Sequence, residues 1–252
     1  MSQILLGAGN SGSRELAPSQ VEGLRGWWGA RFETAYANGS AVTTAHDQST
    51  AGNNINGTGS SAPSYSTVTL INGRNTFSFD GTDDFLEAAG TSGLTAWTQN
   101  PFTIFVVLRP TAVAEEDFFL SGTAGDTHAL FMMVTEGAAG PYFRGHAWQG
   151  AGSANVVNGT SAKSSAIHYI AAQRYDQSSQ NQIWVNGLQE AAAAASGTTG
   201  GAVNVISLGG GSGRGTARFQ GFIAEALLYT RQLTTSETVS VFNYLNTRYT
   251  VY

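Results

Sequence analysis

Short segments in which apolar residues alternate with small polar ones recur along most of the chain, separated by clusters of Gly, Asn, Asp and Ser. A period of two is typical of strands with one buried face, and the clusters are typical of turns. Short strands at this regular spacing predict an antiparallel sandwich of two sheets. The expected strands lie within residues 23–32, 77–79, 85–86, 102–108, 118–121, 129–134, 142–148, 168–175, 182–185, 203–208 and 219–229.

The clearest turn lies in residues 77–86. Phe77 and Phe79 alternate with a serine, a run of aspartates with one glycine follows, and Phe85 begins a new apolar segment. This order of strand, turn and strand predicts a β-hairpin. A second hairpin is expected at Asn186-Gly187, because both residues accept a positive φ.

Two segments depart from the alternating pattern. Residues 102–108 are apolar at nearly every position, which is typical of an interior strand covered on both faces. Near the end of the chain, Thr234 and Glu237 have the spacing of a helix capping box. The apolar residues that follow fall on one helical face and predict a short amphipathic helix; they are Val241, Phe242, Leu245 and Tyr249.

The first 22 residues differ in composition from the rest. A short apolar patch is followed by a flexible glycine-rich stretch, and Pro18 limits any helix that begins before it. We therefore expect residues 1–22 to form an extended arm and residues 23–252 to form one domain.

Three short motifs, in this order along the chain, resemble a known family. They are Trp27-Trp28, the sequence Phe-Asp-Gly-Thr-Asp-Asp-Phe-Leu at 79–86, and a strand containing Glu225 that leads into the terminal helix. Together they resemble the laminin-G-like branch of the concanavalin A-like lectin/glucanase superfamily, in particular the versions carried by bacteriophage virion proteins. The resemblance implies an all-β, two-sheet antiparallel jelly roll with a short C-terminal helix.

Composition narrows the possible functions. The chain has 252 residues, enough for one large all-β domain, and contains no Cys, which excludes Cys nucleophiles and Cys-based zinc sites. Only 12% of residues are charged and the net charge is −5, so no basic surface for nucleic acid is expected. No apolar stretch approaches the length of a membrane span, and no secretory signal is recognisable, so we expect no membrane partner.

Carboxylates are the residues in this sequence that could serve catalysis or metal binding. Glycoside hydrolysis generally needs two of them, and in the glucanase relatives they alternate along one strand; that arrangement is missing here. We expect Glu225 to have a structural role, accepting hydrogen bonds from backbone, Tyr or Arg partners near the helix. Asp80, Asp83 and Asp84 have the oxygen ligands that calcium prefers, but they also suit a turn, so no cofactor and no metal ligand is assigned.

A sugar-binding surface is predicted on one strand. Tyr142, Arg144, His146 and Trp148 alternate and should share a sheet face, where aromatic rings and hydrogen-bond donors suit a saccharide. The other interpretations are a packing ladder between strands and a contact with a neighbouring subunit.

The resemblance implies a structural protein of a phage virion that is not an enzyme, either decorating the capsid or forming part of the tail. We expect it at the virion surface after assembly in the host cytoplasm, bound to other virion proteins through residues 1–22 and forming a homo-oligomer. The alternative is an adhesin module that binds a cell-surface glycan. Binding of a specific saccharide and copy number on the particle separate the two.

Overall fold

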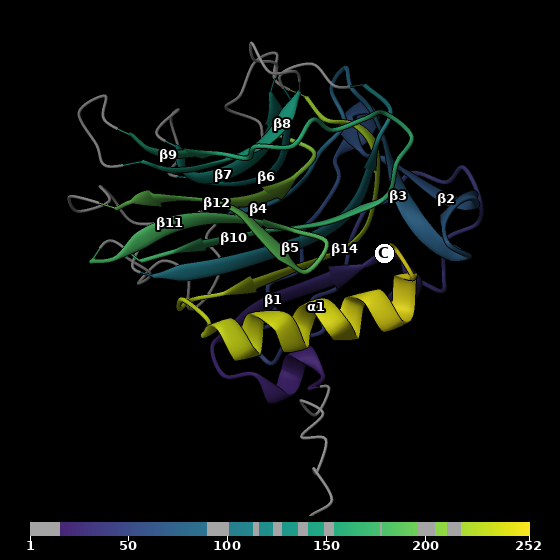
Figure 1. The fold of residues 1–252 in the computed structure, drawn as a ribbon. Helices are drawn as coiled ribbons and strands as arrows, with labels where there is room; N and C mark the ends of the chain where they lie inside the picture. Colours follow the sequence, from purple (N-terminus) through teal and green to yellow (C-terminus); the bar gives the residue numbers. More distant parts are fainter. Residues whose placement is uncertain are drawn as a thin grey trace, which may run out of the picture.

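The computed structural model describes residues 16–89, 101–112, 116–122, 128–135, 141–148, 154–176, 178–195, 205–210 and 218–252. In these residues two antiparallel sheets stack face to face, and one helix near the C-terminal end lies under the larger sheet (Figure 1). This architecture confirms the predicted all-β jelly roll. Within the same residues, no helix has the length and apolar character needed to cross a bilayer.

The larger sheet has the strand order β12-β11-β10-β5-β14-β3-β2, and β1 joins it by pairing with β14. Because β5 lies between β10 and β14 and residues 102–108 are all buried, the prediction of an interior strand is confirmed. The strands of this sheet are β1 (Leu24–Gly29), β2 (Ser64–Ile71), β3 (Arg74–Asp80), β5 (Phe102–Pro110), β10 (Tyr169–Tyr175), β11 (Gln180–Val185), β12 (Leu188–Ala194) and β14 (Gln220–Tyr229).

The smaller sheet has the order β4-β13-β6-β7-β8-β9. Its strands are β4 (Leu86–Ala89), β6 (Glu116–Gly122), β7 (His128–Thr135), β8 (Tyr142–Trp148), β9 (Ala154–Asn158) and β13 (Val205–Leu208). Three short 3₁₀ helices, η1 (Pro18–Gln20), η2 (Ala30–Phe32) and η3 (Gly59–Ser61), lie in the connections between strands or before β1.

The hairpin predicted at residues 77–86 is wrong. β3 pairs with β2 and β14 in the larger sheet, whereas β4 pairs with β13 in the smaller one. The turn between them therefore carries the chain from one sheet to the other. Its composition favours a reversal, but turn residues do not specify which strand the next segment pairs with.

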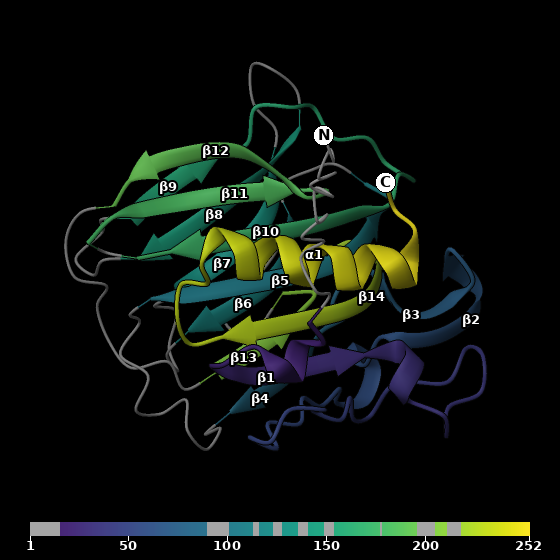
Figure 2. The same cartoon turned by 60° about the horizontal axis from the view of Figure 1, so that its bottom comes forward.

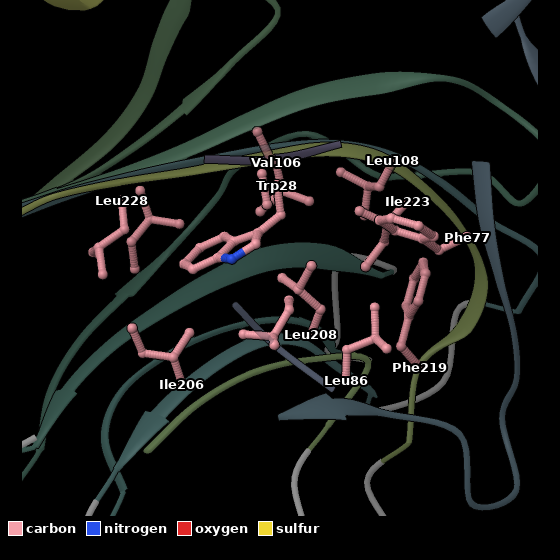
Figure 3. Packing of buried hydrophobic residues seen from close by; sticks show 14 of the residues in the cluster. Trp28, Phe77, Leu86, Val106, Leu108, Ile206, Leu208, Phe219, Ile223 and Leu228 are labelled. Carbon is pink, nitrogen blue, oxygen red and sulfur yellow. The ribbon is translucent and has the colours of Figure 1, made fainter. Parts of the chain in front are cut away.

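The core lies between the two sheets. Phe77, Val106 and Leu228 from the larger sheet meet Leu86 and Leu208 from the smaller one (Figure 3). All five side chains are fully buried, so this cluster is the main source of hydrophobic stabilisation between the layers.

The adjacent tryptophans of β1 point to opposite faces of the larger sheet, as successive strand residues do. Trp28 belongs to the cluster between the sheets, and its indole Nε1–H donates to the Asn53 carbonyl at 2.8 Å. Trp27 belongs to the cluster under the helix. The pair thus connects both faces of the sheet.

The helix α1 (Thr235–Tyr249) crosses the outer face of the larger sheet (Figure 2). Its predicted capping box is confirmed: the Glu237 N–H donates to Thr234 Oγ1 at 3.2 Å, and the Thr234 N–H donates to Glu237 Oε2 at 2.8 Å. The predicted apolar face is also confirmed, because all four of its residues are buried with side chains of the sheet.

Part of the segment expected to form an arm lies beside this helix. The Leu16 N–H donates to Ser240 Oγ at 3.0 Å, the Tyr229 hydroxyl donates to the Pro18 carbonyl at 3.3 Å, and Val21 is buried. Residues 1–15 lie outside the described residues. The division at residue 22 stays a prediction.

Candidate functional site

Strand β8 brings three of the four predicted sugar-binding residues to one face. Phe143 and Ala147 point into the core and are fully buried, so Tyr142, Arg144 and His146 lie on the opposite, outer face of the smaller sheet, where each is half-buried. Trp148 is the last residue of β8, and its side chain lies outside the described part of the chain.

Arg144 contacts two neighbouring side chains on this outer face. It pairs with Asn158 of β9, and its Nε–H donates to Asn158 Oδ1 at 2.8 Å. A second guanidinium nitrogen donates to the Tyr142 hydroxyl at 3.3 Å, and the guanidinium carbon lies 5.8 Å from the centroid of that ring. The arrangement holds a cation, an amide and an aromatic ring within one surface.

The turn between β3 and β4 gathers three carboxylates. One oxygen from each of Asp80, Asp83 and Asp84 lies within 4.8 Å of the others. The same groups also build the turn: Asp80 Oδ1 accepts the Thr82 N–H at 2.7 Å, and Asp84 Oδ2 accepts the Asp80 N–H at 2.9 Å. These residues could hold calcium, but their geometry is equally that of a turn, so calcium binding stays a prediction.

Asp84 has an altered acidity within this cluster. Burial raises the pKa of its carboxyl to about 6, and the charges of Asp80 and Asp83 add to the increase, opposed by the Asp80 N–H. A cation at the turn would remove the repulsion between these charges.

A cleft of about 490 Å³ beside the start of β1 was not predicted. Its lining is mixed, and includes Gln48, Ser49 and Thr50 from a loop that Asp47 organises. The Asp47 carboxylate accepts bonds from the Trp27, Ser49 and Asn53 N–H groups, each at 2.8 Å, and from the Ser49 hydroxyl at 2.7 Å. The carboxylate therefore fixes this loop.

Glu225 has the structural surroundings that were predicted for it. It is fully buried and accepts hydrogen bonds from Arg31 Nε at 3.0 Å, from the Tyr249 hydroxyl at 2.7 Å and from Trp27 Nε1 at 2.5 Å. Burial and the neighbouring Glu225 charge raise the pKa of Tyr249. The predicted Arg and Tyr partners are confirmed, whereas the tryptophan was not foreseen.

A β-bulge explains why Glu225 faces the helix. Ile223 points into the core between the sheets and so does Ala226, although strict alternation would put residues three apart on opposite faces. The register of β14 against β5 shifts between Ile223 and Glu225. Such a bulge inserts one extra residue and redirects the side chains around it.

The comparison with protein families gives one match. The family described as the concanavalin A-like lectin/glucanases superfamily matches residues 80–238. No curated protein sequence matches the chain.

Several solved structures share the fold. A Trypanosoma rangeli sialidase in complex with a difluoro-nononic acid matches with a TM-score of 0.62 at 15% identity, covering 91% of this chain and 33% of that one. The binding domain of botulinum neurotoxin DC in complex with SialylT matches with a TM-score of 0.63 at 10% identity, over 89% and 52% of the two chains. The binding domain of Paraclostridial Mosquitocidal Protein 1 matches with a TM-score of 0.61 at 15% identity, over 88% and 52%.

These comparisons correct the expectation that the protein is not an enzyme. Sialidases are among the structures that share the fold, so the expectation cannot be drawn from the resemblance. The missing alternation of carboxylates on one strand excludes one arrangement of catalytic groups and no other. This chain spans one third to about half the length of the structures described, and at this identity the likeness shows the fold alone.

Proposed function

Because the chain belongs to the concanavalin A-like lectin/glucanases superfamily, we propose that it binds carbohydrate on the outer face of its smaller sheet. The observation that carries the proposal is the grouping of Tyr142, Arg144 and Asn158 on that face. A saccharide presents hydroxyl groups to hydrogen-bond donors and an apolar ring face to an aromatic side chain. The three side chains offer both.

The toxin binding domains with the same fold support this choice, since one of them is in complex with SialylT. In this chain the charged donor is Arg144, which is held in place by its bond to Asn158 before any ligand arrives. A donor held in this way loses little conformational entropy on binding. Trp148, at the end of the same strand, is the expected stacking residue.

A glycan array with the parent protein and three variants tests the proposal. Arg144→Gln removes the charged donor and Trp148→Ala removes the expected stacking ring, so each should weaken the best array signal by about tenfold or more. Arg25→Gln is the matched control, because Arg25 is exposed in the larger sheet and the charge change is the same. Equal signals from all four proteins would refute the proposed face, and so would an array without any saccharide bound by the parent.

A second candidate function is that of a bacteriophage virion component, in a capsid decoration or a tail. The resemblance in sequence and the sparsely charged, Cys-free composition support it. In this proposal the arm contacts other virion proteins, the chain forms a homo-oligomer, and the sheet face that carries Arg144 is turned outward at the virion surface.

Truncation tests the second candidate. Leu16 and Val21 pack on the helix side of the domain, so deletion of residues 1–22 removes buried contacts, and deletion of residues 1–15 is the shorter change that retains them. We expect the shorter deletion to lower both virion incorporation and native mass while the melting temperature stays at the parent value. Unchanged incorporation and mass would exclude anchoring by residues 1–15.

A further inference from the structure

A pocket of about 380 Å³ opens where the C-terminal end of α1 meets the start of β3. Both elements lie at the same end of the molecule in the two views (Figures 1 and 2). The pocket is lined by Arg31, Arg74, Tyr244, Thr247 and Arg248. These residues come from three distant parts of the sequence, which is why no sequence motif indicates them.

The pocket is strongly cationic in an acidic protein. It contains three arginines, although the chain has only 12 Lys and Arg residues and a net charge of −5. Arg31 is paired with the carboxylate of Glu225, which is fully buried. The same carboxylate also accepts hydrogen bonds from Trp27 and Tyr249. Among the described residues, Arg74 and Arg248 form no salt bridge. Two guanidinium groups of the pocket therefore have no carboxylate partner among the residues that the structure describes.

Two of the three guanidinium groups are held in place. Arg31 donates through Nε to Glu225 and through Nη2 to the Tyr244 hydroxyl at 3.3 Å, and its guanidinium carbon lies 3.6 Å from the Phe32 ring centroid. Arg248 lies over the Tyr244 ring, 4.4 Å from its centroid. Arg74, the first residue of β3, is exposed and lines the same pocket. An arginine fork fixed in this way can offer paired N–H donors to an anion.

Compensation of the helix dipole does not account for the cluster. The helix dipole favours a cation in the last turn of α1, near the carbonyls that have no partner within the helix. Two carbonyls at this end have another partner, since Asn72 Nδ2 donates to those of Tyr249 and Thr250 at 2.5 and 2.7 Å. The dipole would also explain neither Arg31 nor Arg74, which lie outside the helix.

We propose that this pocket binds a single anionic group, a carboxylate or a phosphate, of a small ligand. Arg74 and Arg248 supply the charge, Arg31 supplies a fixed donor, and Thr247 completes the lining. The site is independent of the proposed glycan face, because it lies on the helix side of the larger sheet whereas Arg144 is on the outer face of the smaller sheet.

Titration calorimetry at low ionic strength tests the site with three probes: inorganic phosphate, glucuronate and uncharged glucose. We expect saturable binding of at least one of the two anions and none of glucose. Arg74→Gln and Arg248→Gln should each raise the Kd about tenfold, and the double variant about a hundredfold, because a bond to a charged donor is lost each time. Arg31 stays unchanged, since its bond to buried Glu225 supports the fold.

Arg25→Gln is again the matched control, because it removes one exposed charge distant from the pocket. Parent affinity in this control and loss in the double variant support the site, and the anion preferred shows whether the ligand carries a phosphate or a carboxylate. The proposal is overturned if neither anion binds saturably, if the double variant binds as tightly as the parent, or if Arg25→Gln weakens binding equally. Melting temperatures near that of the parent establish that the variants are folded.

Discussion

Glu225 is a buried charge whose partners join four elements of the fold. Trp27 lies on β1, Arg31 on η2 and Tyr249 on α1, while Glu225 itself lies on β14. A buried carboxylate is tolerated only when its charge and its lone pairs are matched by donors. Glu225, which follows the bulge in β14, thereby connects the first strand of the domain to its last helix.

Replacing Glu225 by Gln should destabilise the protein by about 3 kcal/mol, because Arg31 loses its counter-charge and the bonds weaken. Tyr249→Phe removes one hydrogen bond to the buried carboxylate and should cost about 2 kcal/mol. Urea unfolding of the two variants and the parent measures both values. A Gln variant as stable as the parent would show that the charge contributes nothing to the fold.

The Asp84 carboxyl should make stability depend on pH. Its pKa in the folded protein is about 6, above the ordinary value of 3.8, so protonation of Asp84 favours the folded state. The contribution of the protonated carboxyl to stability is complete below pH 3.8 and is lost as pH rises through 6. Asp84→Asn should therefore raise the free energy of unfolding by up to about 3 kcal/mol at pH 8 and leave it unchanged at pH 3.5.

Thermal unfolding at several pH values checks this prediction, with the exposed Glu22→Gln as a control. An Asp84→Asn variant with the same pH profile as the parent would contradict it. The same experiment with added calcium tests the turn as a metal site, because bound calcium would raise the melting temperature of the parent at pH 8 and have less effect on the variant.

At the scale of elements, the beginning of α1 depends on Glu237. Its carboxylate accepts from the Thr234 N–H and from Arg231, and these contacts lower its pKa to about 2, the Arg231 bond being the largest cause. Because this pKa is depressed, the ionised Glu237 carboxylate stabilises the fold above its ordinary pKa of 4.5, and this stabilisation is lost as pH falls toward 2.

Glu237→Gln should lower the free energy of unfolding by about 1 kcal/mol at pH 7, a value that allows for solvent screening of this partly exposed pair. The difference should disappear near pH 2. Chemical unfolding at the two pH values measures it, and an equal difference at both would mean that the charge has no part in capping.

Local patterns were sufficient to predict several elements. The uninterrupted apolar run gave the central position of β5, and the capping residues gave the beginning of α1. Asn186-Gly187 does form the turn between β11 and β12, with φ values of 50° and 81°. Each of these depends on neighbouring residues alone.

Features that depend on distant residues could not be predicted in this way. The turn after β3 leads to the other sheet because Leu86 is buried in the core opposite Phe77, which no local pattern indicates. The arginine pocket combines residues 31, 74 and 248. The shared face of Tyr142, Arg144 and His146 was predictable, since it follows from a period of two within one strand.

At the scale of the whole molecule, the two faces of the sandwich differ. The outer face of the larger sheet is covered by α1 and by Leu16 and Val21, while the face that carries Arg144 lies on the opposite side (Figure 1). A ligand that binds Arg144 would therefore contact the molecule on the side away from its first described residues. This arrangement suits a domain held at one side and exposed at the other.

NMR mapping of the saccharide with the strongest array signal onto the isotope-labelled protein tests whether carbohydrate binds on the outer face of the smaller sheet. We predict that the largest shift changes occur at Tyr142, Arg144 and Asn158, and that they disappear in Arg144→Gln while Arg25→Gln retains them. Changes confined to the cleft beside β1, or to the arginine pocket, would contradict the assignment of carbohydrate binding to the outer face of the smaller sheet.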